Sequence, residues 1–141
     1  MIAAPEEASI SVATGAGEWV ALRVEFTLGI GESELAANAG NGKHFEFWRR
    51  AGAEGSYSGD LLEAEKLDSQ GRLALITGVT GSPPQQEVGP TVTRKVIGVA
   101  SSGRRTALDA APTASVATPS LQLLGGVVHW TDAGVERTAA P

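Results

Sequence analysis

Trp19-Val-Ala-Leu-Arg-Val-Glu-Phe-Thr-Leu28 is the stretch of sequence that decides the fold. Large apolar side chains occupy every second position, and the positions between them include Arg23 and Glu25. Residues two apart lie on the same face of a β-strand, whereas a helix would spread them around its circumference. The stretch therefore predicts a half-buried strand. Its apolar face is expected to carry Val20, Leu22, Val24, Phe26 and Leu28.

Apolar runs after this stretch predict further strands. Residues 44–50 resume the alternation. Residues 91–100 form a second long run that is apolar on both faces near its end, which favours a position inside a sheet. Residues 121–130 return to strand character around Gly125 and Gly126, where a bulge or a close backbone approach is expected.

A hairpin is predicted between residues 62–67 and 72–77, because Asp68-Ser-Gln-Gly71 is a favourable turn sequence. A short helix capped at Asp60 is the alternative. Helices are too few for β-α-β units. The predicted fold class is therefore all-β: an antiparallel β-sandwich or small barrel with extended N- and C-terminal arms and long loops.

The length of 141 residues is that of one domain. Residues 1–9 are expected to form an N-terminal arm and residues 131–141 a C-terminal tail, with a single β-rich domain over 10–130. Ala, Ser, Thr and Pro dominate residues 101–120, which are therefore expected to form a long loop of the functional kind. Large apolar side chains are few, so we expect a thin core that a partner or oligomerisation completes.

Composition excludes several functional classes. The net charge of -5 disfavours non-specific binding to nucleic acid or to an anionic membrane. No apolar run approaches the roughly 20 residues that a membrane-spanning helix needs. The chain has no cysteine, which excludes disulfides, cysteine-ligated zinc and thiol catalysis. We therefore expect a protein that is made in the cytoplasm and has neither nucleic acid nor a membrane as its partner.

No segment carries a complete catalytic or cofactor motif. A triad needs a nucleophile, a base and a carboxylate in contact, and neither His44 nor His129 accompanies a nucleophile-elbow sequence. Residues 40–43 resemble the end of a phosphate-binding loop, but Ala37 and His44 stand where that loop needs Gly and Ser or Thr. We predict no enzymatic activity, no cofactor and no metal. An enzyme with a histidine in a cleft beside carboxylates is the minor alternative.

Two pairs of carboxylates are expected to be solvated. Glu63 and Glu65 share a strand face, and Glu32 and Glu34 fall in the Gly-rich stretch 29–43, which is predicted to be mainly a loop. Spacing in sequence does not show whether either pair flanks a cleft, as glycoside hydrolysis requires.

The aromatic residues leave two alternatives open. Trp19 and Trp48 lie on the more polar faces of their strands, so with Trp130 and Tyr57 they are candidates for an exposed carbohydrate-stacking platform. The other alternative is a sandwich that covers both faces and places the tryptophans in the core.

Val92-Thr-Arg-Lys-Val-Ile-Gly-Val-Ala100 and Leu123-Leu-Gly-Gly-Val-Val128 are strand segments with short aliphatic centres. In these segments the chain resembles accessory structural proteins of tailed bacteriophages, in particular small capsid-decorating proteins. The resemblance implies a β-rich module that binds capsid subunits through extended arms, often as a trimer.

Together these observations predict a non-enzymatic virion structural protein, most of all a capsid decoration (cement) protein that stabilises the head by bridging neighbouring capsid subunits. A head fibre or tail component, and a stand-alone immunoglobulin-like or carbohydrate-binding sandwich, are the alternatives. The expected partners are the major capsid protein or other virion subunits, together with further copies of the chain. The predicted partner contacts are Ile2, Pro5, Trp19, Trp48, Arg104, Arg105, Leu108, Pro112 and Pro119.

Overall fold

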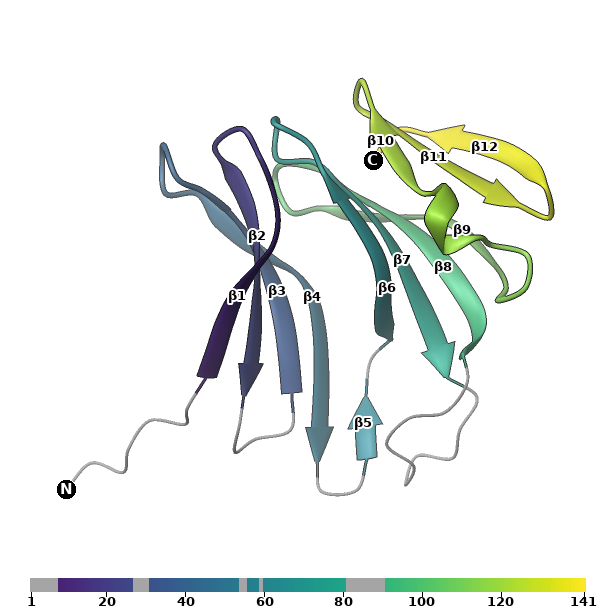
Figure 1. Ribbon diagram of the computed structural model, residues 1–141, viewed down its shortest axis with the longest axis horizontal. Helices are drawn as coiled ribbons and strands as arrows, with labels where there is room; N and C mark the ends of the chain where they lie inside the picture. Colours follow the sequence, from purple (N-terminus) through teal and green to yellow (C-terminus); the bar gives the residue numbers. More distant parts are fainter. Residues whose placement is uncertain (1–7, 27–30, 54–55, 59, 81–90) are drawn as a thin grey trace.

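A computed structural model of the chain describes residues 8–26, 31–53, 56–58, 60–80 and 91–141. In these ranges the chain is all-β, and its strands form three antiparallel sheets of five, four and three strands (Figure 1). The predicted fold class is confirmed. In every sheet the spatial order of the strands is their order in the sequence, so each sheet is a meander of hairpins.

The five-stranded sheet consists of β1 (Ala8–Ala16), β2 (Trp19–Phe26), β3 (Gly31–Asn38), β4 (His44–Ala53) and β5 (Ser56–Ser58). The four-stranded sheet consists of β6 (Leu61–Leu67), β7 (Leu73–Thr80), β8 (Thr91–Val99) and β9 (Arg105–Pro112). The three-stranded sheet consists of β10 (Gln122–Leu124), β11 (Val127–Asp132) and β12 (Val135–Ala139), and the short 3-10 helix η1 (Thr118–Ser120) precedes it.

The four-stranded sheet lies between the other two and is covered on both faces (Figure 1). The first core layer joins it to the five-stranded sheet through Trp19, Ala21, Ala36, Phe47, Trp48, Leu73, Leu75, Ile97 and Val99. The second core layer joins it to the three-stranded sheet and the chain before it through Ala74, Ile76, Val96, Val116, Leu121, Val128 and Trp130. This double coverage explains why residues 73–78 and 96–99 are buried without alternation, as in other sheets covered on both faces.

The β6–β7 hairpin and the central place of β8 are confirmed. β6 pairs with β7, and β8 lies between β7 and β9. In the hairpin turn, Asp68 Oδ1 accepts hydrogen bonds from the backbone N–H groups of Gln70 and Arg72 at 2.9 and 3.0 Å. Gly71 takes the left-handed conformation with φ of 80° that the turn sequence predicts.

The covered face of β2 is the one with fewer aliphatic side chains. Trp19 and Ala21 lie in the first core layer, with exposed fractions of 6% and 0%. The row of aliphatic side chains is half-buried on the other face of the strand: Val20, Leu22 and Val24. The Phe26 side chain and Leu28 lie outside the described residues.

The position of Trp19 accounts for the choice of this face. Its ring lies so close to Gly71 that a Cβ at that position would overlap it. The ring also lies 6.0 Å from the Phe45 ring. Period-two patterning identifies two faces of a strand but not which one a second sheet covers. The covered face is the one that carries the large Trp19 side chain, because this side chain packs against the β6–β7 turn.

Three predicted loops or tails contain strands instead. β3 lies in residues 29–43, β9 in residues 101–120, and β12 in the expected C-terminal tail. Small and polar residues form strands here because ladder hydrogen bonds come from the backbone, and the uncovered face needs no large side chain. The end of the chain also packs on the middle sheet, because a Cβ at Gly98 would lie 2.5 Å from Pro141 Cα.

Candidate interaction surfaces

The outer face of the five-stranded sheet, which points away from the first core layer, carries a continuous group of aliphatic side chains. Cross-strand pairing brings Ile10 beside Val24 and places Leu22 between Val12 and Leu35. Ile10 and Val12 are 65% and 66% exposed. We call this group the outer-face patch: Ile10, Val12, Val20, Leu22, Val24 and Leu35.

Uncharged residues fill the rest of this face on β1 to β3, and charged groups begin on β4. Among the described residues of β3, Ser33 and Ala37 share the face with Leu35. On β4, Arg49 Nε donates to Glu46 Oε1 at 3.0 Å beside the patch. An apolar centre with a polar border is the usual layout of a protein–protein interface.

The charged end of the first core layer holds two carboxyl groups that the sequence analysis expected to be solvated. The Glu34 side chain on β3 is fully buried, and neither of its oxygens has a hydrogen-bond partner among the described residues. Glu65 on β6 approaches it from the facing sheet. On the neighbouring strand, an Arg23 nitrogen lies 3.6 Å from a Glu34 oxygen, and the guanidinium lies 5.2 Å from the centroid of the Trp48 ring.

Burial raises the pKa of Glu34 to about 8, and the interaction with the Glu65 carboxyl adds to this effect. The Arg23 guanidinium acts in the opposite direction, but Arg23 also donates to Glu32 at 3.0 Å. At neutral pH, Glu34 is therefore mostly protonated. It is a neutral polar group held between two sheets, and the expectation of a solvated Glu34 is wrong.

A second pair of carboxyl groups lies where the middle sheet meets the three-stranded sheet. Trp130 Nε1 donates to Asp109 Oδ2 at 2.8 Å, and Arg137 lies 4.0 Å from Asp109 and 3.7 Å from Asp132. Burial acts to raise the pKa of Asp109, but the hydrogen bonds from Trp130 and Asp132 hold it below its usual range. The hydrogen bond with Asp109 raises the pKa of Asp132. This pair is a structural contact between β9 and β11.

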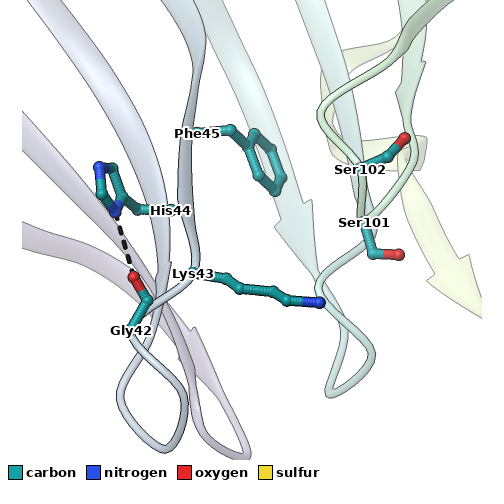
Figure 2. Close-up of a pocket in the computed structure, with 6 residues that line it drawn as sticks. All are labelled: Gly42, Lys43, His44, Phe45, Ser101 and Ser102. Carbon is teal, nitrogen blue, oxygen red and sulfur yellow. Dashed lines mark hydrogen bonds between the residues drawn. The ribbon is translucent and has the colours of Figure 1, made fainter.

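An open cavity of about 390 Å³ lies between the start of β4 and the loop that joins β8 to β9. Its lining residues are Gly42, Lys43, His44, Phe45, Ser101 and Ser102. Figure 2 shows the Lys43 and Phe45 side chains pointing across the gap toward the two serines. The His44 ring points the other way, with its Nδ1 3.1 Å from the Gly42 carbonyl oxygen.

The predicted partner contacts separate into four groups. Trp19 and Trp48 are buried in the first core layer, so their expected place in the core is confirmed and an exposed platform at these positions is wrong, whereas the described residues cover only one face of the five-stranded sheet. The exposed residues are Arg104, Arg105, Pro112 and Pro119, whereas Leu108 is half-buried against the second core layer. Ile2 and Pro5, as well as the Tyr57 side chain, lie outside the described residues.

The structure does not bring the two histidines together. His44 lies at the start of β4 in the five-stranded sheet. His129 lies on β11 in the three-stranded sheet, where its Nδ1 is 3.3 Å from Glu136 Oε1. Neither belongs to a group of three or more potential metal ligands, and the described part of the chain holds no such group.

Sequence reasoning missed the outer-face patch, although a signal was present. Alternation leaves open which face of β2 is covered, and Trp19 and Trp48 lie on the more polar faces of their strands. Two large aromatic side chains on the same side of one sheet indicate the covered face more strongly than a row of valines and leucines, since an aromatic side chain buries more apolar area.

In the described residues, no helix is long and apolar enough to cross a membrane. Comparison of the chain with protein families, with curated proteins and with solved structures finds no match.

Proposed function

We propose that the chain is a non-enzymatic virion structural protein: a capsid decoration protein that forms an oligomer and stabilises a phage head by bridging neighbouring capsid subunits. The outer-face patch is the observation that carries this proposal. A contiguous group of aliphatic side chains on an uncovered sheet face favours a surface that binds another molecule. Valine and isoleucine that remain 65–66% exposed on β1 are better explained by burial in an assembly.

The virion role draws its support from the resemblance carried by residues 92–100 and 123–128. The first segment includes most of β8 and the second spans β10 and the start of β11. Val96 and Val128 belong to the same core layer. The resemblance therefore concerns the architecture of the module, and the proposed oligomer draws its support from the outer-face patch.

A second copy of the chain is the proposed occupant of the patch. The described residues of this face on β1 to β3 are uncharged, so two copies packed face to face bury no unpaired charge there. The Glu46–Arg49 pair remains at the solvated border. β1 is also an edge strand of its sheet and offers backbone groups for contacts with a neighbour.

The substitution Val12→Lys tests the patch. Because Val12 is 66% exposed on an edge strand, a lysine is tolerated in the monomer but places a charge inside the proposed contact. We expect light scattering to give an oligomer for the unchanged chain and a monomer for Val12→Lys. The matched control is Val135→Lys on β12, where the valine is 58% exposed, and this variant keeps the oligomer. An unchanged chain that is monomeric, or a loss of the oligomer in both variants, contradicts the patch as a self-association surface.

The virion role is tested by co-sedimentation with heads assembled from the major capsid protein of the same genome. We expect saturable binding of the full chain to mature heads and a rise in the temperature at which the heads disassemble. No binding to heads, whatever the oligomeric state of the chain, contradicts the decoration role.

A further inference from the structure

We infer that the cavity between the start of β4 and the β8–β9 loop, together with the unpaired edge of β9, binds an extended acidic segment of a partner protein. This inference rests on the proposed function, because it names the chemistry of the virion subunit that the chain would bridge. It concerns a different surface from the outer-face patch, which is assigned to a second copy of the chain.

Unpaired positive charge gathers at this place in the molecule. Most described basic side chains lie beside a carboxylate, for example Arg94 beside Glu63 at 3.0 Å. Within the described ranges, four basic side chains have no ion pair: Lys43, Lys66, Arg104 and Arg105. Of these, Lys43 lines the cavity, and Arg104 and Arg105 follow the lining residues Ser101 and Ser102 within three positions of the chain, in a protein whose net charge is -5. Such a local excess, against the sign of the whole chain, favours an anionic partner.

The cavity offers groups suited to a carboxylate side chain. Lys43 supplies an ammonium group, and Ser101 and Ser102 supply hydroxyl donors, all from residues that line the same 390 Å³ space (Figure 2). No acidic residue is among the lining residues. The Phe45 ring gives the cavity an apolar wall, against which the methylene groups of a glutamate can pack.

The loop between β8 and β9 is held in place against β4. A Cβ at Gly103 would lie 3.2 Å from Phe45 Cβ, so the loop backbone packs directly on this residue. Backbone hydrogen bonds close the loop, from Gly103 N to the Ala100 oxygen at 2.8 Å and from Ala100 N to the Arg104 oxygen at 2.9 Å. The backbone that carries the serines and Arg104 is therefore held in place before any partner arrives, which lowers the entropic cost of binding.

The edge of β9 favours an extended segment over a free anion. β9 is the last strand of its sheet, and one of its edges pairs with no described strand. Arg105 is paired with Val99, so its side chain lies on the face of the sheet that is turned toward the five-stranded sheet, yet it is exposed. A partner strand added along β9 would gain backbone hydrogen bonds and bring its carboxylates past Arg105 toward the cavity.

The test uses the full chain and a hexaglutamate peptide as the probe, followed by amide chemical shifts in NMR titrations. We expect shifts in residues 42–45 and along 101–107, with an affinity that falls as NaCl is raised. Lys43→Gln, Arg104→Gln and Arg105→Gln should each weaken binding roughly two- to fivefold, the range of a single exposed ion pair. The matched control is Lys66→Gln, which removes an exposed, unpaired lysine on β6 and should leave the affinity unchanged.

Three results overturn the inference: no binding, binding that Lys66→Gln weakens as much as Lys43→Gln does, and shifts that omit β9. Inorganic phosphate is the second probe, and binding as tight as that of the peptide shows a small-anion site instead. The Val12→Lys variant separates this inference from the proposed function. If the unchanged chain is an oligomer, Val12→Lys is a monomer and the peptide does not bind, then the inferred binding of an acidic segment is wrong and the outer-face patch is still supported. If the peptide binds and no oligomer or head binding is found, the proposed function is wrong.

Discussion

At the scale of single residues, Glu34 is the position where the chain departs furthest from ordinary burial rules. A buried carboxyl group usually finds a hydrogen-bond donor or a full ion pair. Glu34 instead faces Glu65, and Arg23 is shared between Glu34 and Glu32. Because Glu34 is protonated at neutral pH, it places no uncompensated negative charge between the two sheets.

The raised pKa of Glu34 makes the stability of the fold depend on pH. Between its ordinary value of 4.5 and about 8, the folded chain holds a proton that the unfolded chain releases. The free energy of unfolding therefore falls as pH rises through this window, by at most about 1.4 kcal/mol per pH unit for one proton. Glu34→Gln should remove this slope and be more stable than the unchanged chain at pH 9, as measured by urea unfolding at pH 5, 7 and 9. Glu25→Gln, at an exposed position on β2, is the control that keeps the slope. A slope of equal size in Glu34→Gln contradicts the buried proton.

At the scale of elements, the turn between β6 and β7 fixes how the first two sheets meet. Its Gly71 supports the left-handed turn and leaves room for Trp19 of β2. The turn and the strand partner were both predictable from Asp68-Ser-Gln-Gly71. The contact with Trp19 was not, because it joins residues that are far apart in sequence and depends on the crossing of two sheets.

The variant Gly71→Ala tests this contact. We expect a loss of about 2 to 4 kcal/mol, of which about 1 to 2 comes from the left-handed backbone and the rest from displacing the Trp19 ring. Gly134→Ala is the matched control, since Gly134 has φ of 77° and nothing within 4 Å of an added Cβ. Urea unfolding of both variants gives the difference. Equal losses at the two positions mean that the Trp19 ring does not lie on Gly71.

At the scale of the whole molecule, the fold class followed from the sequence but the number of layers did not. Alternation and turn residues predicted the strands of β2, β4, β7 and β8, because these have large side chains on at least one face. β9 and β12 escaped prediction because they are edge strands rich in small or polar residues. The candidate site was partly predictable: Arg104 and Arg105 were predicted contacts and Ser101 and Ser102 lie on the same loop, whereas Lys43 meets these serines only through the approach of the chain before β4.

The meander order of the three sheets has a consequence for how the chain is made. Strands that are neighbours in a sheet are also neighbours in sequence, so each sheet can close as soon as its own strands leave the ribosome. The five-stranded sheet is complete first, with Trp19 and Phe47 uncovered until β6 to β9 have been synthesised. During that interval the nascent chain presents an aromatic surface to chaperones and to other nascent chains, and synthesis of the middle sheet ends this exposure.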